Sequence, residues 1–179
     1  DKALLGPGAV KTSGGGMFVY GGMDGTESTD EAWTYDYVLG DHQNIAQLGT
    51  PRADFRAAAD SSNHAYAIGG INSDGNEVLD SVEQYSQSAD AWEEVATLPA
   101  PRHSIAAVAD DAGHIYVFGG SATAAAGDIQ NTSFRYDVAT DSWNAIASLP
   151  IAVEDSAAVM ADNGSIYVLG GLTDAGATA

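Results

Sequence analysis

The most constraining feature of this sequence is a short apolar run that ends in a glycine pair and occurs four times. The first glycines of the four pairs are 48, 50 and 51 residues apart. A period of about 50 residues is typical of an array of equivalent structural units that pack side by side. The spacing therefore predicts a repeat protein, but it does not identify what the array binds. The runs are Met17–Gly22, Ala65–Gly70, Ile115–Gly120 and Ile166–Gly171.

Two aromatic residues follow the glycine pairs at a fixed spacing. In the second and third units a tyrosine is followed seven positions later by a tryptophan. The first unit departs from this pattern, because His42 follows Tyr35 at the tryptophan position. The two complete pairs are Tyr85 with Trp92 and Tyr136 with Trp143.

A corner that begins with leucine comes next in each unit. It reads Leu-Gly-Thr-Pro-Arg over Leu48–Arg52 and Leu-Pro-Ala-Pro-Arg over Leu98–Arg102. The third corner, Leu149–Val153, has Ala-Val where the other two have Pro-Arg. Together, the glycine pair, the two aromatic residues and this corner resemble the kelch repeat of β-propellers, from about Ala9 to Gly171.

The resemblance implies an all-β, kelch-type β-propeller made of four-stranded blades. The residues favour the same fold, because runs such as Ile115–Phe118 are short and rich in β-branched and aromatic residues. We expect about three and a half blades, at residues 9–46, 55–96 and 105–147 with a half blade at 156–171. In the second blade the strands are expected near Phe55–Ala59, Ala65–Ile68, Ser81–Tyr85 and Trp92–Ala96.

A half blade would leave strand edges without partners, which propellers normally avoid by closing with four to eight blades. We therefore interpret residues 1–179 as one propeller segment that belongs to a larger ring. Ala3–Gly8 is expected to be the tail of a preceding fourth strand. A four-bladed ring, or a ring closed by self-association, stays open as an alternative.

Charge restricts the partners and the setting. The 25 acidic and 6 basic side chains give a net charge of -19, which disfavours nucleic acid and anionic membranes as partners. The composition resembles that of proteins from salt-loving organisms, with an ordinary acidic secreted domain as the alternative. No apolar run is long enough to suggest membrane insertion. We expect an extracellular or cell-surface location, with the cytoplasm as the alternative.

The resemblance also indicates where a ligand would bind. In propellers the loops between the second and third strands share one face with the corners that lead into the next blade. In kelch domains that bind peptides or sugars, corner arginines and small polar residues make the contacts. An arginine at these corners can also be structural, and aspartates there can simply stabilise turns. The candidate ligand-binding residues are Arg52, Asp54, Arg102, His103, Ser104, Glu154 and Asp155.

Metals and cofactors have little support in the sequence. The loops Asp24–Glu31 and Asn72–Glu77 carry oxygen donors that suit Ca²⁺, but neither matches the twelve-residue calcium loop. The four histidines lie at different places in different units and show no zinc spacing. We therefore expect no cofactor, with calcium as the one alternative. The histidines are His42, His64, His103 and His114.

Two functional classes fit these features. The first is a binding module that presents one loop face to a protein segment or a carbohydrate. The second is an enzyme that resembles the kelch-type sialic acid mutarotases. In this chain Arg102 would then hold the sugar, and His103 and Glu154 would act as acid and base. The sequence favours the binding module, because it shows no recognisable catalytic triad and no phosphate-binding loop.

Overall fold

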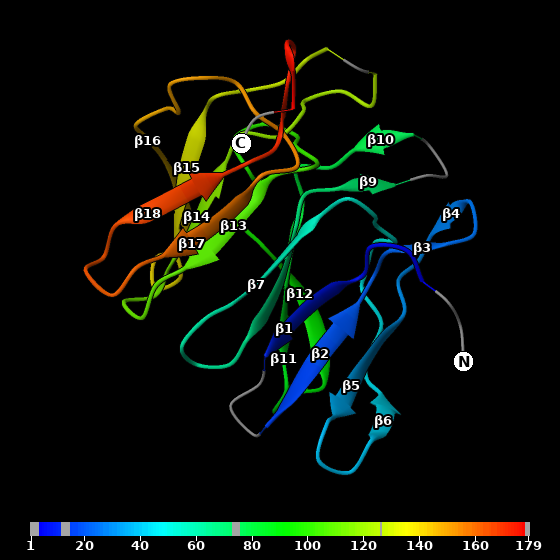
Figure 1. The fold of residues 1–179 in the computed structure, drawn as a ribbon. Coiled ribbons are helices and arrows are strands. Elements are labelled where there is room, and N and C mark those ends of the chain that lie inside the picture. The colour runs from blue at the N-terminus through cyan, green and yellow to red at the C-terminus, as the bar shows by residue number, and fades with distance from the viewer. Residues whose placement is uncertain (1–3, 12–14, 73–75, 126, 178–179) are drawn as a thin grey trace.

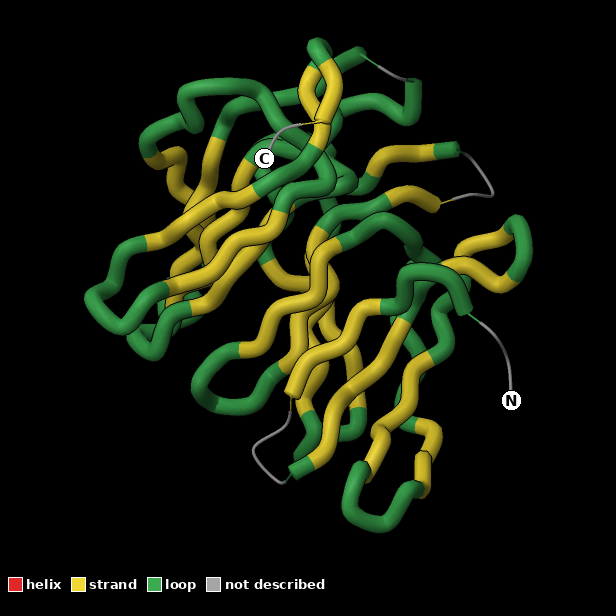
Figure 2. The backbone as a smooth tube through the Cα atoms, viewed as in Figure 1, coloured by secondary structure: helices red, strands yellow, loops and turns green. Residues whose placement is uncertain are grey.

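The chain folds entirely into β-strands and connecting loops (Figures 1 and 2). The computed structural model describes residues 4–11, 15–72, 76–125 and 127–177. Regular structure in these ranges consists of strands, as the short β-branched and aromatic runs predicted. No helix in the described ranges is long and apolar enough to cross a membrane.

Three four-stranded antiparallel sheets follow one another along the chain, and each forms one blade. Blade 1 contains β1 (Gly8–Lys11), β2 (Gly16–Tyr20), β5 (Ala32–Asp36) and β6 (Asp41–Asn44). Blade 2 contains β7 (Arg56–Ala59), β8 (Ala65–Ile68), β11 (Val82–Ser86) and β12 (Ala91–Val95). Blade 3 contains β13 (Ala106–Ala109), β14 (His114–Phe118), β15 (Ser133–Asp137) and β16 (Ser142–Ile146).

A half blade follows blade 3 and consists of β17 (Ala157–Met160) and β18 (Ile166–Leu169). The innermost strands lie side by side in the order β1, β7, β13 and β17, but the ring is not closed (Figure 1). No sheet among the described residues covers the outer side of the half blade, and Tyr167 and Leu169 are exposed. The equivalent tyrosine of blade 2, Tyr66, is completely buried.

Short hairpins and corners lie together at one end of the blades, which we call the loop face. The hairpins are β3 (Met23–Asp24) with β4 (Glu27–Ser28), β9 (Ile71–Asn72) with β10 (Glu77–Val78), and β19 (Leu172–Thr173) with β20 (Gly176–Ala177). Isolated bridges join the corners to this face, at Leu5 with Met23, Ala53 with Ile71, His103 with Ser121 and Glu154 with Leu172. The shared face expected from the propeller resemblance is therefore confirmed.

The segment before β1 differs from the expectation. Leu5 pairs with Met23 in the same way that Ala53 pairs with Ile71, so Leu5 occupies a corner position. The described part of Ala3–Gly8 is therefore a corner leading into β1, and Gly8 already belongs to that strand. Ala3 lies outside the described residues.

Aromatic side chains fill the space between blades. Tyr20 of blade 1 packs against Phe55 and against the ring of Trp92, whose centroid is 4.8 Å away. The indole N–H of Trp92 donates to the Ala46 carbonyl at 2.8 Å. This hydrogen bond joins blade 2 to the segment that follows the last strand of blade 1. Trp143 repeats this bond to Ala96 one blade later, also at 2.8 Å. The repeated tryptophan is thus a contact between blades, a position that suits its large apolar area and its polar N–H.

The glycine pairs are required by the corner of the next blade. In the first three pairs the second glycine donates its N–H to a corner carbonyl: Gly22 to Arg52, Gly70 to Arg102 and Gly120 to Val153. The first glycine lies so close to that carbonyl that a Cβ on Gly119 would overlap the oxygen of Val153. Both glycines of each pair also have positive φ, which glycine adopts without strain.

Candidate binding site at the loop face

Three corner residues lie next to one another on the loop face. Asp54, Ser104 and Asp155 have φ of 50°, 51° and 51°, in the left-handed region. The backbone N–H of Ser104 donates to the Asp54 carbonyl, and that of Asp155 donates to the Ser104 carbonyl, each at 2.9 Å. These bonds link the corners that lead into blade 2, blade 3 and the half blade, so the fold brings together residues that are about 50 positions apart in sequence.

Their side chains form a polar, solvent-accessible group. Asp54 and Asp155 are exposed, and Ser104 is half-buried. His103 lies beside them, with Nδ1 3.3 Å from the Ser104 hydroxyl and Nε2 3.0 Å from the Thr123 carbonyl. Glu154 is half-buried next to Asp155. The group therefore offers carboxylates, a hydroxyl and an imidazole to a ligand.

Arg52 points away from this surface and is completely buried. Its Nη2 donates to Glu83 Oε1 at 2.6 Å, and its Nη1 donates to the Gly69 carbonyl at 2.8 Å. The same carboxylate accepts the backbone N–H groups of Gly49 and Thr50. Burial lowers the pKa of the Arg52 guanidinium, and the charge of Glu83 opposes this effect. The described contacts thus give Arg52 a structural role, which is one of the two roles considered above for an arginine at this corner.

Arg102 is also buried, with 5% of its surface exposed, but it has different partners. Phe134 occupies the strand position that Glu83 has in blade 2, because Phe134 pairs with Val117 as Glu83 pairs with Ala67. Arg102 instead donates to the Pro101 carbonyl at 2.7 Å and the Thr132 hydroxyl at 3.1 Å. Its Nε has no hydrogen-bond partner among the described residues. Burial lowers the pKa of Arg102, with Asp128 acting in the opposite direction.

Arg56 is a residue that the sequence did not single out. It begins the inner strand of blade 2, and it donates from Nε to the Ile105 carbonyl at 2.8 Å and from Nη2 to the Ser156 carbonyl at 3.0 Å. Its guanidinium therefore connects the inner strand of blade 2 to the residues immediately before the inner strands of blade 3 and the half blade. Burial lowers its pKa, and Asp155 opposes this. The only signal in the sequence is that Gly8, Ala106 and Ala157 occupy the same strand position in the other units.

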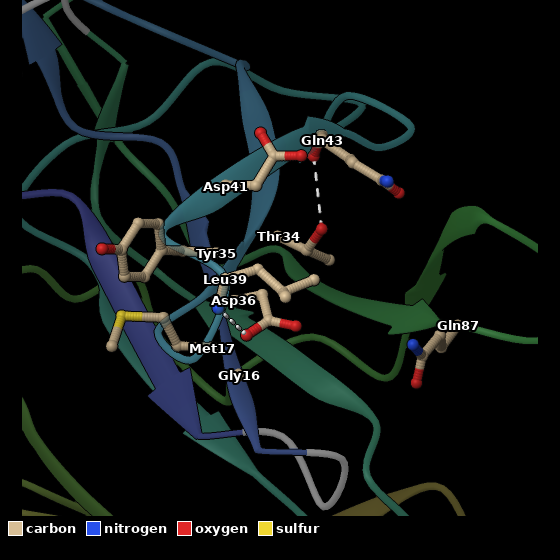
Figure 3. Close-up of a pocket in the computed structure, with 9 residues that line it drawn as sticks. All are labelled: Gly16, Met17, Thr34, Tyr35, Asp36, Leu39, Asp41, Gln43 and Gln87. Carbon is tan, nitrogen blue, oxygen red and sulfur yellow. Dashed lines mark hydrogen bonds between the residues drawn. The ribbon is translucent and has the colours of Figure 1, made fainter.

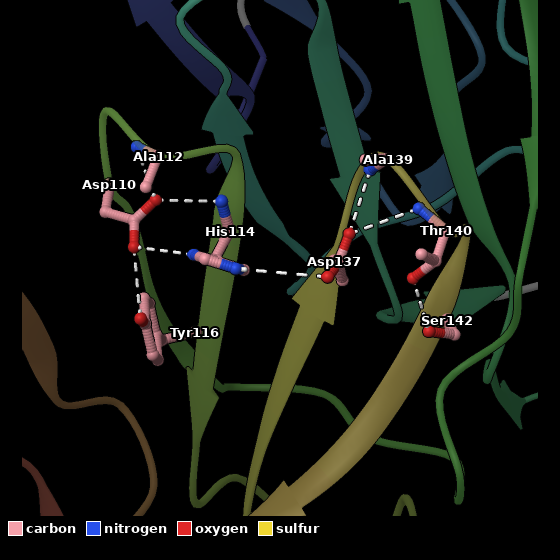
Figure 4. A network of polar contacts seen from close by, with 8 residues as sticks. All are labelled: Asp110, Ala112, His114, Tyr116, Asp137, Ala139, Thr140 and Ser142. Carbon is pink, nitrogen blue, oxygen red and sulfur yellow. Dashed lines mark hydrogen bonds and ion pairs between the residues drawn. The ribbon is translucent and has the colours of Figure 1, made fainter.

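A second polar group lies at the opposite end of the blades, at the turns within residues 60–64 and 110–114. In blade 3, Asp110 accepts the His114 backbone N–H at 2.8 Å, and its other oxygen lies 2.9 Å from His114 Nδ1 and 3.0 Å from the Tyr116 hydroxyl (Figure 4). On the far side of the imidazole, Nε2 lies 4.0 Å from Asp137. Burial alone would raise the pKa of Asp110, but these hydrogen bonds hold it below its ordinary value.

Blade 2 repeats this arrangement with Asp60, His64 and Tyr66 at nearly the same distances. His64 and His114 are therefore equivalent, and the interpretation that all four histidines occupy different places was wrong. The signal was present, since these two histidines are 50 residues apart and each stands two positions before a tyrosine. The repetition in two blades, with hydrogen bonds that close a turn, indicates a structural role.

The described residues contain no group of three or more histidine, cysteine, aspartate or glutamate side chains placed to hold a metal ion. The loop Asp24–Glu31 forms the β3–β4 hairpin and its continuation. Ser73, Asp74 and Gly75, in the middle of the other loop considered for calcium, lie outside the described residues. The expectation of no cofactor, with calcium as the alternative, stays a prediction.

Comparison with known proteins agrees with this architecture. The model of the Attractin/LZTR1 β-propeller family matches residues 9–178, so the chain belongs to this family of kelch-type β-propellers. The solved structure of YjhT is similar with a TM-score of 0.81 and 16% sequence identity, over 95% of this chain and 60% of that one. At this identity the likeness shows the fold alone, and this chain spans 60% of the length of YjhT. No curated protein matches the chain.

Proposed function

We propose that this chain is part of a ligand-binding propeller whose loop face holds a carbohydrate or a protein segment. The observation that carries the proposal is the row of Asp54, Ser104 and Asp155, which backbone hydrogen bonds hold side by side across three blades. The backbone of this row is fixed, so a ligand would not have to order it on binding. Binding sites commonly lie on loops that a rigid scaffold positions in this way.

The chemistry of the row favours ligands that donate hydrogen bonds. Two exposed carboxylates and a hydroxyl accept hydrogen bonds from sugar hydroxyls, from peptide N–H groups and from lysine or arginine. Arg52 and Arg102 are buried, so the accessible polar groups on this face are mostly acceptors. A neutral oligosaccharide or a cationic peptide fits this face better than an anionic ligand.

Saturation-transfer NMR with maltotriose, N,N′-diacetylchitobiose and a lysine-rich hexapeptide tests the proposal. At least one of them should show saturable binding that weakens in the double variant Asp54→Asn with Asp155→Asn. Asparagine also tolerates the left-handed conformation, so this variant should keep the fold. Asp162→Asn, which changes an exposed aspartate of the β17–β18 turn, is the matched control.

Equal binding by the double variant and the control, or no saturable binding by any probe, would overturn the proposal. The same samples separate binding from the alternative activity, sugar mutarotation. For mutarotation, the protein would have to accelerate the exchange of sialic acid anomers measured by NMR. Binding without such acceleration identifies a binding module.

A further inference from the structure

Two tripeptides near the C-terminal end of the chain have the form that accepts N-linked sugars. This form is Asn-x-Ser or Asn-x-Thr with x other than proline, and it occurs at Asn131–Ser133 and Asn163–Ser165. The sugar is attached to the asparagine Nδ2, and the transferase also recognises the hydroxyl of the third residue. The structure places these two acceptor tripeptides in different surroundings.

The second acceptor tripeptide forms the turn between β17 and β18. Asn163, Gly164 and Ser165 are all exposed. Asn163 Oδ1 accepts the backbone N–H of Ser165 at 3.0 Å, which closes an Asx turn. This is the one hydrogen bond that the Asn163 side chain makes to the described residues, so its Nδ2 is available to a reagent. The turn therefore presents the amide nitrogen and the Ser165 side chain to solvent.

Several turns at this end of the blades are closed by a side-chain oxygen that accepts an N–H two residues later. In blade 1, Asp36 accepts the N–H groups of Val38 at 2.8 Å and Leu39 at 3.0 Å, at the edge of a pocket of about 220 Å³ (Figure 3). In blade 3, Asp110 accepts the Ala112 N–H at 2.9 Å (Figure 4). These oxygens belong to carboxylates, whereas the half blade uses an amide. The amide keeps the turn and adds a nitrogen that a sugar can substitute.

The exposure of Asn163 follows from its position in the repeat. Asn163, Ala112 and Ser62 each lie three residues after the last residue of an innermost strand, so they are equivalent. Ala112 and Ser62 are exposed too, in blades that have all four strands. The β17–β18 turn lies at the end of the blades away from the loop face (Figure 1), so a glycan there leaves the loop face accessible.

The first acceptor tripeptide lies at the start of β15 and is held by its neighbours. Asn131 Nδ2 donates to the Leu149 carbonyl at 3.2 Å, and the Asn131 carbonyl accepts the Leu149 N–H at 2.8 Å. Ser133 is 1% exposed and pairs with Phe118 and Ile146 on the two neighbouring strands. A transferase could reach this tripeptide only after the start of β15 had detached from the sheet.

We propose that Asn163 is an N-glycosylation site and that the fold excludes Asn131 from the same modification. The substrate is a sugar or oligosaccharide activated by a pyrophosphate-linked carrier. A bond forms between Asn163 Nδ2 and C1 of the sugar, the bond from C1 to the carrier oxygen breaks, and one Nδ2 proton passes to a base of the transferase. The proposal depends on the extracellular or cell-surface location expected from the sequence. It does not depend on the ligand proposed for the loop face.

Treatment of the folded full chain with a soluble asparagine N-glucosyltransferase and UDP-glucose tests the selection by the fold. Trypsin then cleaves after Arg135, which puts the two tripeptides into separate peptides, 103–135 and 136–179, for tandem mass spectrometry. Asn163 should gain a hexose about tenfold or more faster than Asn131, because β15 must open locally before Asn131 can react. This difference should largely disappear when the tryptic peptides themselves are the substrates.

Ser165→Ala and Ser165→Thr are the matched variants for this experiment. Ser165→Ala keeps the backbone N–H that closes the turn but removes the hydroxyl, so Asn163 should no longer be modified. Ser165→Thr restores a hydroxyl and should keep the modification. If Asn131 reacts as fast as Asn163 in the folded chain, or if Ser165→Ala is modified as fast as Ser165→Thr, the proposal is wrong.

Mass spectrometry of the full chain purified from its native cells shows whether the site is used. The expected result is a glycopeptide of residues 136–179 with the intact glycan on Asn163. The glycan itself must be detected, because an Asn-Gly pair also converts spontaneously to Asp-Gly. A chain in which Asn163 is found only unmodified or deamidated would contradict the proposal.

Discussion

Residues at equivalent positions of the repeat make different contacts in different blades. Arg52 and Arg102 occupy the same corner position, but only Arg52 meets a carboxylate, because blade 2 has Glu83 where blade 3 has Phe134. Arg56 connects the inner strand of blade 2 to the residues immediately before the inner strands of blade 3 and the half blade, from a position that glycine or alanine fills elsewhere. A repeat therefore specifies the backbone, and single side chains decide what each blade contributes.

The Arg52–Glu83 pair provides a stability prediction. Its side chains are 0% and 2% exposed, so Glu83→Ala leaves a buried cation without its partner and also removes the acceptor for two backbone N–H groups. Breaking such a buried pair costs about 3–5 kcal/mol. Urea unfolding followed by circular dichroism should show this loss, and Glu93→Ala, an exposed change in the same blade, should stay within about 0.5 kcal/mol. A loss for Glu83→Ala no larger than that of the control would contradict the structural role of the pair.

The hydrogen bonds to several aspartates predict that the fold loses stability in acid. Asp90 accepts the Ala46 N–H and the Tyr85 hydroxyl, each at 2.9 Å, and these bonds hold its pKa below the ordinary 3.8. Asp110 and Asp137 have lowered pKa values for similar reasons. A lowered folded-state pKa stabilises the fold above the ordinary carboxyl pKa, and this contribution is lost as the pH falls through the folded value. The free energy of unfolding should therefore fall steadily as the pH drops below about 4.

Asp90→Asn tests this assignment, because it removes one of the titrating groups. The variant should be less stable than the wild type at pH 6, and the difference should narrow at pH 3, as measured by urea unfolding at both values. A difference that stays the same at the two pH values would show that the charge of Asp90 does not contribute.

At the scale of elements, the blades are fastened to one another by a few repeated contacts. The tryptophan N–H groups bind the preceding blade at Ala46 and Ala96, and the glycine pairs accommodate the corner of the following blade. The tryptophan hydrogen bonds join residues that are 46 or 47 positions apart, which is close to the repeat period. Stability of the array therefore depends on contacts between neighbouring blades, as in other repeat proteins.

The glycine pairs allow a matched test of this explanation. Gly119 and Gly170 are equivalent first glycines with φ of 61° and 65°, so alanine should strain the backbone equally at both positions. A Cβ at 119 would overlap the carbonyl oxygen of Val153, whereas a Cβ at 170 meets nothing within 4 Å. Gly170→Ala should cost about 1–2 kcal/mol, and Gly119→Ala should cost several kcal/mol more. Equal costs in urea unfolding would show that the close approach of the next corner is unimportant.

For the whole molecule, charge and the open end are the dominant features. The net charge of -19 on 179 residues destabilises the compact state through self-repulsion, which dissolved salt screens. The half blade leaves Val159, Tyr167 and Leu169 exposed, where complete blades bury the equivalent strands against a neighbour. Solution conditions and neighbouring blades should therefore influence this chain more strongly than they influence a closed, neutral domain.

Raising the KCl concentration from 0.1 M to 2 M should raise the midpoint of thermal unfolding, measured by circular dichroism. The reason is that the Debye length falls below the spacing of most surface charges in this range. Sorbitol at matched osmolality is the control for general solute effects. A midpoint that rises no more in KCl than in sorbitol would argue against charge repulsion as a limit on stability.

Much of the fold could be predicted from the sequence. The glycine pairs, the tyrosine–tryptophan spacing and the apolar runs predicted an all-β kelch-type propeller, because strand formation and burial produce local patterns that recur at the repeat period. The positions of Asp54, Ser104 and Asp155 at one surface followed from the same period, since equivalent residues of neighbouring blades must lie side by side.

Only the tertiary structure decided the direction and the partners of individual side chains. The sequence could not tell that Arg52 and Arg102 point inward, or that Arg56 reaches the residues immediately before the inner strands of blade 3 and the half blade. These features depend on which residue of another strand, about 30 to 100 positions away, stands opposite. Strand register and blade packing determine which residues become those neighbours, and no local pattern in the sequence indicates them.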